Sequence, residues 1–136
     1  MKGFIPHIIG NTETEAFYYI PGTTDEDYAI GEALVLSSGK VTLDATGAFP
    51  AYLCRTKLDD CPAGTLICVT PVRADIEYET EVATGGLTTY AVGTAVDIYS
   101  DGMTVTDKDS QSNGSFEIVY AAGGTAGDKV IVRPIM

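Results

Sequence analysis

Hydrophobic and polar residues alternate with a period of two in several short stretches of this chain. The clearest stretch is 77–82, in which three glutamates alternate with tyrosine, threonine and valine. This pattern is typical of a β-strand with one face exposed to water. Other short apolar runs end at turn-forming pairs that contain Gly, Pro or Asn. The predicted strands are 17–20, 29–36, 41–43, 47–54, 66–72, 77–82, 92–99, 103–106, 116–120 and 129–133.

No window of the chain combines a sustained 3.6-residue periodicity with good helix caps, so helix is expected to be scarce. About ten short strands with Gly-rich turns are typical of an all-β sandwich or barrel. We therefore predict a small all-β barrel or sandwich of short antiparallel strands, with an extended N-terminal arm.

The sequence contains an internal repeat. Segment 63–73 (AGTLICVTPVR) matches segment 126–136 (AGDKVIVRPIM) at a constant offset of 63 residues, and 28–31 (YAIG) matches 90–93 (YAVG) at an offset of 62. Between them, Gly47 and Gly114 match at an offset of 67. The length changes fall in polar, turn-forming stretches, where added residues cost little. The sequence predicts a single domain, 1–136, with pseudo-repeats at about 17–73 and 79–136 that build one continuous core.

Residues 1–16 are the arm, which has no counterpart in the second repeat. Its apolar run is broken by Pro6 and closed by Gly10 and Asn11. An exposed apolar arm usually has a surface to pack against. Two interpretations stay open, namely packing onto the chain's own barrel and docking on a neighbouring subunit.

The bulk composition is that of one globular domain. A chain of 136 residues can bury roughly two-thirds of its unfolded surface without the help of a metal or disulfides. The net charge of −11 and a pI near 4.2 disfavour nucleic acid as a partner. The N-terminus has no apolar signal region and no run has the length of a membrane span, so we expect a soluble protein made without a signal peptide.

Three cysteines, Cys54, Cys61 and Cys68, are spaced by seven residues. This odd number and spacing match neither a disulfide framework nor a zinc site. Cys68 falls opposite Ile131 in the other repeat, so it is interpreted as a small buried hydrophobic residue. A reducing compartment during folding follows from this interpretation.

The search for catalytic chemistry gives no site. His7 is the only histidine and lies in the arm, and no nucleophile elbow is present. The acidic groups 25–27 and Asp59–Asp60 adjoin turns, where aspartate is favoured for its geometry alone. Segment 107–114 resembles a calcium loop superficially but lacks the required Gly and bidentate Glu. We expect no catalytic residue, no metal site and no cofactor.

Two segments, 28–40 (YAIGEALVLSSGK) and 90–102 (YAVGTAVDIYSDG), together with the ending AGDKVIVR, resemble the small decoration (auxiliary or cement) proteins of tailed-bacteriophage capsids. The resemblance covers about residues 17–136. It implies a structural virion protein, made in the host cytoplasm, that binds the outer surface of the capsid and stabilises the head. The implied partner is the major capsid protein, with a homo-oligomer on the lattice as a further option and no contact with nucleic acid or membrane.

Two hypotheses about binding remain. Under the first, the apolar arm residues Phe4, Ile5, Ile8 and Ile9 are the capsid contact. Under the second, the chain is a carbohydrate-binding or adhesin-like β-sandwich with exposed aromatic residues as its platform. Its candidate platform residues are Tyr18, Tyr19, Tyr52, Tyr78, Tyr99 and Tyr120.

Overall fold

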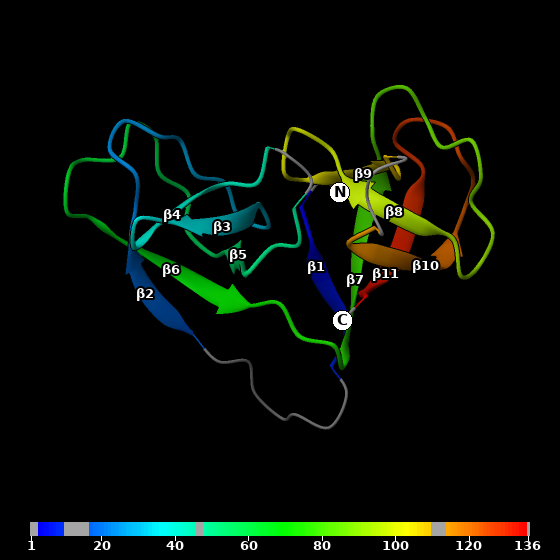
Figure 1. Ribbon diagram of the computed structural model, residues 1–136, viewed down its shortest axis with the longest axis horizontal. Helices are drawn as coiled ribbons and strands as arrows, with labels where there is room; N and C mark the ends of the chain where they lie inside the picture. The colour runs from blue at the N-terminus through cyan, green and yellow to red at the C-terminus, as the bar shows by residue number, and fades with distance from the viewer. Residues whose placement is uncertain (1–2, 10–16, 46–47, 110–113, 136) are drawn as a thin grey trace.

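The computed structural model describes residues 3–9, 17–45, 48–109 and 114–135, with only the backbone course given for residues 7–9. Figure 1 shows two groups of strands side by side and no helix in this part of the chain. The predicted all-β class is therefore confirmed. The strands are β1 (Ile5–Ile9), β2 (Tyr18–Pro21), β3 (Ala33–Ser37), β4 (Lys40–Leu43), β5 (Tyr52–Cys54), β6 (Leu66–Pro71), β7 (Ile76–Val82), β8 (Ala95–Ile98), β9 (Thr104–Asp107), β10 (Phe116–Ala121) and β11 (Lys129–Pro134).

The first half of the chain forms a closed five-stranded barrel. Its strand order is β2-β6-β5-β3-β4, and a parallel bridge between Gly22 and Val41 joins the two outer strands. Inside this seam the buried Tyr28 hydroxyl donates a hydrogen bond to the Val41 carbonyl at 2.6 Å. Closure leaves few free strand edges, which limits unwanted pairing with other chains.

The second half repeats this strand order. Its sheet runs β1-β7-β11-β10-β8-β9, and β7 also pairs in parallel with β9, so five strands again close into a ring. The sixth strand, β1, lies outside the ring and pairs antiparallel with β7. The corresponding strands of the two halves are therefore β2 and β7, β3 and β8, β4 and β9, β5 and β10, and β6 and β11. The prediction of two pseudo-repeated halves is confirmed.

Backbone hydrogen bonds follow the same correspondence. The N–H of Gly31 donates to the Cys54 carbonyl at 2.8 Å, and the N–H of Gly93 donates to the Ile118 carbonyl at the same distance. Both glycines have a positive φ, 88° and 90° respectively. Each therefore occupies the left-handed region that favours glycine, at the same turn of the repeat.

The structure corrects the predicted alignment at one place. The N–H of Ala51 donates to the Leu34 carbonyl, and that of Ser115 donates to the Val96 carbonyl. These equivalent bonds set the offset before β5 and β10 at 64 residues, which places Gly114 opposite Pro50, whereas Gly47, its predicted match, lies outside the described residues. Gly114 has a positive φ, and its identity as a turn glycine misled the alignment.

The predicted boundaries of four strands also need correction. β5 begins at Tyr52 and not at residue 47. Strands β3 and β8 begin at Ala33 and Ala95, later than predicted, because the residues before them form the glycine turns. The turn from β8 to β9 spans 99–103, which is longer than a two-residue Asp-Gly hairpin.

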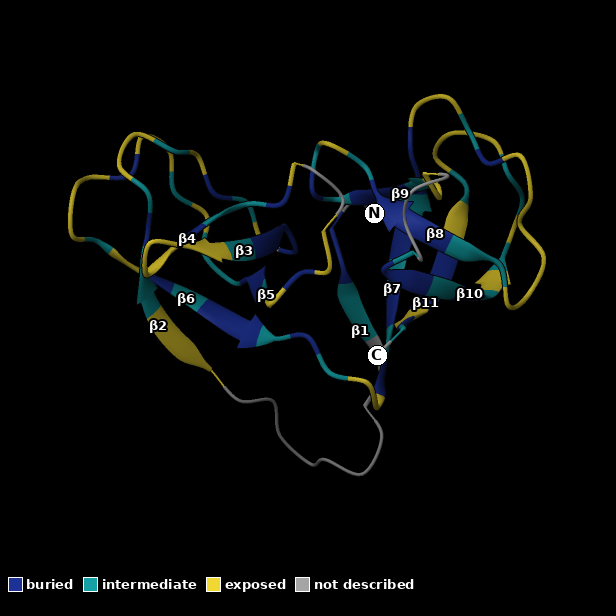
Figure 2. Cartoon of the chain, in the orientation of Figure 1, coloured by how far each residue is buried: buried dark blue, intermediate teal, exposed yellow. Residues whose placement is uncertain are grey.

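Buried side chains form two clusters, one of which lies within the first barrel (Figure 2). The larger cluster fills the second barrel and also contains Phe4, Ala33, Leu53 and Val72. Because these four residues precede the second barrel in the chain, the larger core spans the junction of the two halves. Burial of apolar area at this junction stabilises the contact between them.

A close contact between two glycines brings the start of β1 against the first barrel. The N–H of Phe4 donates to the Gly31 carbonyl at 2.8 Å, and a Cβ on Gly31 would lie 2.8 Å from the Gly3 Cα. A Cβ on Gly3 would lie 2.9 Å from the Ile30 carbonyl oxygen. No side chain fits between these backbones.

We predict that Gly31→Ala destabilises the protein more than Gly93→Ala does. Both changes place an alanine at a positive φ, which costs about 1–2 kcal/mol. Gly93 has no atom within 4 Å of an added Cβ, whereas Gly31 meets the Gly3 backbone, and such overpacking costs a further 1–3 kcal/mol, roughly. Urea unfolding of the two variants measures the difference. Equal losses of unfolding free energy would contradict the glycine contact.

Candidate interaction surface

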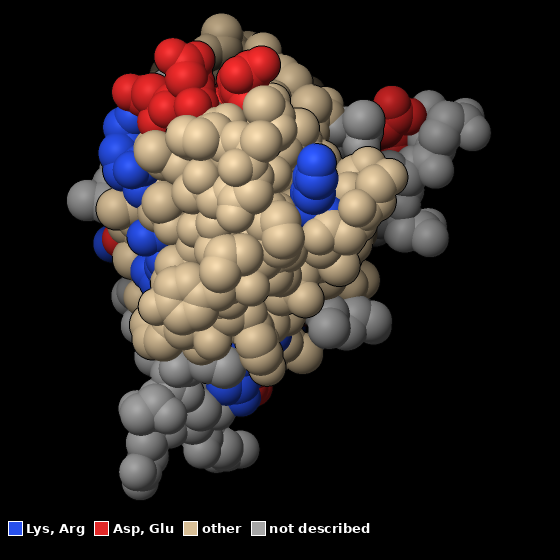
Figure 3. All heavy atoms as spheres, turned by 90° about the vertical axis from the view of Figure 1, so that its left-hand side faces the viewer, with Lys and Arg blue, Asp and Glu red and all other residues tan. Residues whose placement is uncertain are grey.

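The outer face of strands β2 and β6 carries four uncharged side chains, which we call the β2–β6 strip. Tyr19 lies opposite Cys68, and Pro21 lies opposite Leu66. Directly opposed residues of an antiparallel pair point to the same side, so all four share one face. Tyr19 is 67% exposed and Leu66 is 55% exposed. Viewed from the outer end of the first barrel, acidic side chains gather at one edge of a largely uncharged surface (Figure 3).

Three of the four equivalent positions in the second barrel are charged, and the fourth is Ile131. With β6 and β11 aligned at the 63-residue offset, the positions of Tyr19, Pro21 and Leu66 correspond to Glu79, Glu81 and Lys129. Lys129 and Glu79 form an ion pair at 2.7 Å. The two halves share a backbone but differ in the chemistry of this face.

The arm residues predicted as a capsid contact occupy β1 and the residue before it. Phe4 is 1% exposed and stacks on Phe116, with ring centroids 5.1 Å apart. Ile5 is half-buried and lies opposite Glu79 in the β1–β7 pair. The side chains of Ile8 and Ile9 lie outside the described part of the structure. The described part of the arm thus packs onto the chain's own second barrel, which agrees with the first of the two interpretations.

We predict that Phe4→Ala lowers the free energy of unfolding by about 3–5 kcal/mol, because it leaves a cavity in the core that joins the two halves. Phe17→Ala is the matched control, since Phe17 is exposed, and it is expected to cost less than about 1 kcal/mol. Thermal and urea unfolding measure both changes. A Phe4→Ala variant as stable as the control would show that Phe4 is not a core residue.

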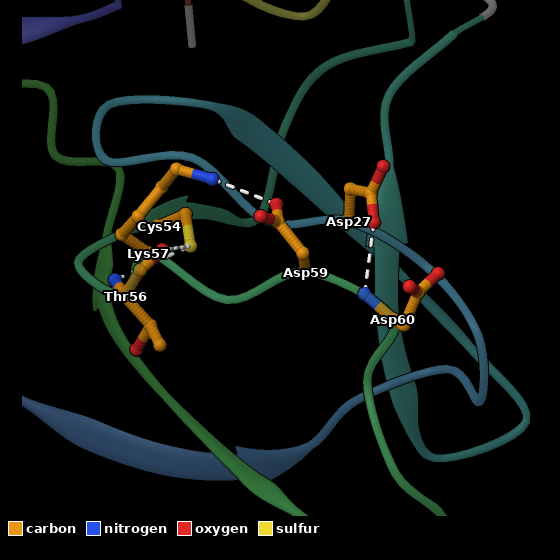
Figure 4. A network of polar contacts seen from close by, with 6 residues as sticks. All are labelled: Asp27, Cys54, Thr56, Lys57, Asp59 and Asp60. Carbon is orange, nitrogen blue, oxygen red and sulfur yellow. Dashed lines mark hydrogen bonds and ion pairs between the residues drawn. The ribbon is translucent and has the colours of Figure 1, made fainter.

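Acidic side chains in the loops of the first barrel serve the loop structure (Figure 4). The Asp27 carboxylate accepts a hydrogen bond from the Asp60 N–H at 2.9 Å, and Asp59 pairs with Lys57 at 2.7 Å. Asp25 and Asp60 have positive φ values, a backbone conformation that aspartate tolerates better than most residues. The hydrogen bond of Asp27 and the ion pair of Asp59 therefore link residues of these loops to one another.

Two acidic residues of the first half of the chain, Glu32 and Asp44, are buried, and Glu32 lies at the junction with the second barrel. Among the described residues, the Oε1 atom of Glu32 has no hydrogen-bond partner. Its Cγ lies 3.3 Å from the position of an added Cβ on Gly102, so Glu32 contacts the β8–β9 turn of the second barrel. Burial raises the pKa of Glu32 to about 7, and the nearby charges of Glu26, Asp27 and Asp101 contribute in the same direction.

This shift in pKa predicts a pH-dependent stability. A raised pKa means that the folded protein favours protonated Glu32. The contribution of this proton to the free energy of unfolding is complete below pH 4.5 and is lost as the pH rises through about 7. Glu32→Gln should remove this loss and be more stable than the wild type at pH 8, by at most about 3 kcal/mol. Urea unfolding from pH 5 to pH 8 measures the difference. Parallel stability curves for the two proteins would contradict the prediction.

All three cysteines are free thiols. Cys54 and Cys61 are buried, and burial raises the pKa of the Cys54 thiol to about 11, which makes it a poor nucleophile at neutral pH. Cys68 corresponds to Ile131, as predicted, but it is half-buried on the β2–β6 strip. Its interpretation as a buried residue therefore needs correction, because its strand presents that side chain to the outer face.

The six tyrosines do not form one platform. Tyr78 is 1% exposed and belongs to the core, whereas Tyr18 and Tyr52 contact each other in the first barrel with ring centroids 6.4 Å apart. Tyr120 is exposed on β10, in the other half of the chain. These positions divide the tyrosines between a core and two separate surfaces.

A surface hollow of about 260 Å³ lies beside β8 and β9. Two of its carboxylates have partners in the adjoining loops: Asp97 accepts from the Asp109 N–H, and Asp107 accepts from the N–H and hydroxyl of Thr88. Residues 110–113 of the calcium-like segment lie outside the described residues. The residues that line the hollow are Ala45, Asp97, Ile98, Tyr99, Ser100, Thr106, Asp107 and Asp109.

Within the described ranges, no group of three or more His, Cys, Asp or Glu side chains has the arrangement to hold a metal ion. His7 lies in β1, and its side chain is outside the described part of the structure. The described residues also include no helix that is long and apolar enough to cross a membrane. No protein-family model matches the chain, and a search of curated proteins finds no significant match.

Proposed function

We propose that this chain is a structural protein of a tailed-phage virion, which binds the outer surface of the capsid through the β2–β6 strip and braces the head. One observation carries the proposal. The face that holds Glu79, Glu81 and Lys129 in the second barrel is uncharged in the first barrel, although the chain as a whole has a net charge of −11. Loss of charge with exposure of aromatic and aliphatic groups is characteristic of the centre of a protein interface.

The rest of the molecule is consistent with a role in contact. Two closed barrels share a buried cluster at their junction, so they hold the strip in a fixed orientation. A rigid surface loses little conformational entropy on binding, which favours affinity. The resemblance to capsid decoration proteins supplies the partner in this proposal, the major capsid protein. Individual contacts can be weak if one protein bridges several capsid subunits, because the later contacts form at high effective concentration.

The proposal predicts that the purified protein binds undecorated capsids assembled from the major capsid protein of the same phage. Co-sedimentation and electron microscopy measure the occupancy. The double variant Tyr19→Glu/Leu66→Lys places on the first barrel the ion pair that the second barrel already carries, so the fold is expected to tolerate it. We expect it to lower the affinity at least tenfold, because charge is introduced into a desolvated contact.

A matched control is Tyr120→Ser, which changes an exposed tyrosine on the other barrel and is expected to leave the occupancy unchanged. Full occupancy by the double variant would exclude the strip as the contact. No binding of the wild-type protein to capsids at any concentration tested would exclude the capsid as the partner.

A further inference from the structure

The outer edge of β7 is occupied by a strand from the same chain. β1 pairs with residues 76–79 of β7, on the side away from β11. Beyond this stretch, the same edge of β7 pairs with β9 and closes the barrel. One edge of β7 therefore has two roles, strand docking in its first part and barrel closure in its second.

In the part of the chain that the structure describes, the corresponding edge of β2 has only the second role, barrel closure. Gly22 bridges to Val41 and closes the first barrel. Among the described residues, no strand pairs with the preceding part of this edge, which comprises Phe17, Tyr18 and Tyr19. These three residues correspond to 77–79 of β7, where β1 lies. A free edge of this kind presents unpaired backbone N–H and C=O groups.

An aromatic pair is also repeated at the two edges. Tyr78 packs edge-on to Phe116, with centroids 6.3 Å apart and an interplanar angle of 75°. Tyr18 packs on Tyr52 in nearly the same way, at 6.4 Å and 71°. Strand register makes Tyr18 the equivalent of Tyr78, and Tyr52 the equivalent of Phe116.

The two aromatic pairs differ in what covers them. In the second half, Phe4 and Phe49 both stack on Phe116, and Tyr78 is 1% exposed. In the first half, Tyr18 is 50% exposed. Figure 2 shows the same contrast between the strands, since β2 is largely exposed and β7 is largely buried. The first half thus has the equivalent aromatic pair, but within the described ranges no segment equivalent to residues 3–9 lies over it.

From this comparison we infer that the β2 edge, with Tyr18 and Tyr52, is a docking site for an extended segment of another polypeptide. The segment resembles residues 3–9 of this chain: an aromatic side chain stacks on Tyr52, and the following residues pair with β2 as an added strand. Backbone hydrogen bonds to the open edge supply affinity, and the aromatic pocket supplies selectivity. The inference goes beyond binding by the β2–β6 strip, because it assigns a strand-accepting site and the chemistry of its occupant.

The experiment uses the intact protein, isotopically labelled for NMR, and a capped peptide with the sequence GFIPHII. We expect saturable binding, with chemical-shift changes at Phe17, Tyr18, Tyr19 and Tyr52. Tyr18→Ala should weaken binding about tenfold, since it removes half of the aromatic pair. Tyr52→Phe should retain binding, because the occupied site has phenylalanine at this position.

Two controls separate the site from other effects. Tyr120→Ala removes an equally exposed tyrosine and should leave the peptide affinity unchanged. A peptide in which alanine replaces the phenylalanine should bind at least tenfold more weakly. No capsid is present, so the result is independent of the proposed capsid role.

Three results would overturn the inference. The first is the absence of saturable binding. The second is chemical-shift change confined to β7, which would mean that the peptide displaces β1. The third is a dimer of the protein alone, with the β2 edge already paired to a second copy and closed to the peptide.

Discussion

The asymmetry of this molecule follows from one contact, the packing of Gly3 and Phe4 against Gly31 and Phe116. The glycine backbones approach too closely for a Cβ, and Phe4 is buried beside them. This contact directs the N-terminal segment along β7 and places its aromatic ring in the core between the halves. The described residues contain one such segment and two equivalent edges, so within them the duplicated fold has one covered edge.

The duplication also provides an internal comparison for the surface. Both barrels have the same strand order and the same parallel closure, so the backbone does not dictate the chemistry of their outer faces. The second barrel keeps charged side chains, which is the usual state of a solvated strand face. The first barrel exposes Tyr19 and Leu66 at the equivalent positions. The outer faces of the two barrels therefore differ in charge because their side chains differ, and not because their backbones do.

The sequence predicted those elements whose residues alternate or recur. Segments 66–72, 77–82 and 129–133 correspond closely to β6, β7 and β11, because alternation and the 63-residue offset both reflect local pairing. Identity of residue type was a weaker guide, as Gly47 and Gly114 show. Ile30 and Val92 were included in strands because they are apolar, yet both are exposed beside the glycine turns.

The candidate site was harder to predict from sequence, because burial there depends on a distant segment. Tyr18 and Tyr78 are the same residue at the same position of the repeat, but Tyr18 is half exposed and Tyr78 is buried in the cluster that contains Phe4. Their neighbours along the chain differ, but the sequence does not show that a distant segment contributes to the burial of Tyr78. The aligned repeats do carry one signal for the β2–β6 strip. Tyr19 and Leu66 occupy the positions that Glu79 and Lys129 occupy in the second repeat, so charged residues are replaced by uncharged ones.

The two proposed contacts lie on the same strand, and this has an energetic consequence. Side chains of β2 alternate between the outer strip, at Tyr19 and Pro21, and the inner aromatic pair, at Tyr18. A partner segment that pairs with the β2 edge therefore comes within reach of both faces. Once the strand has docked, contacts to the strip form at high effective concentration, so weak interactions at the two faces can add to a stable attachment.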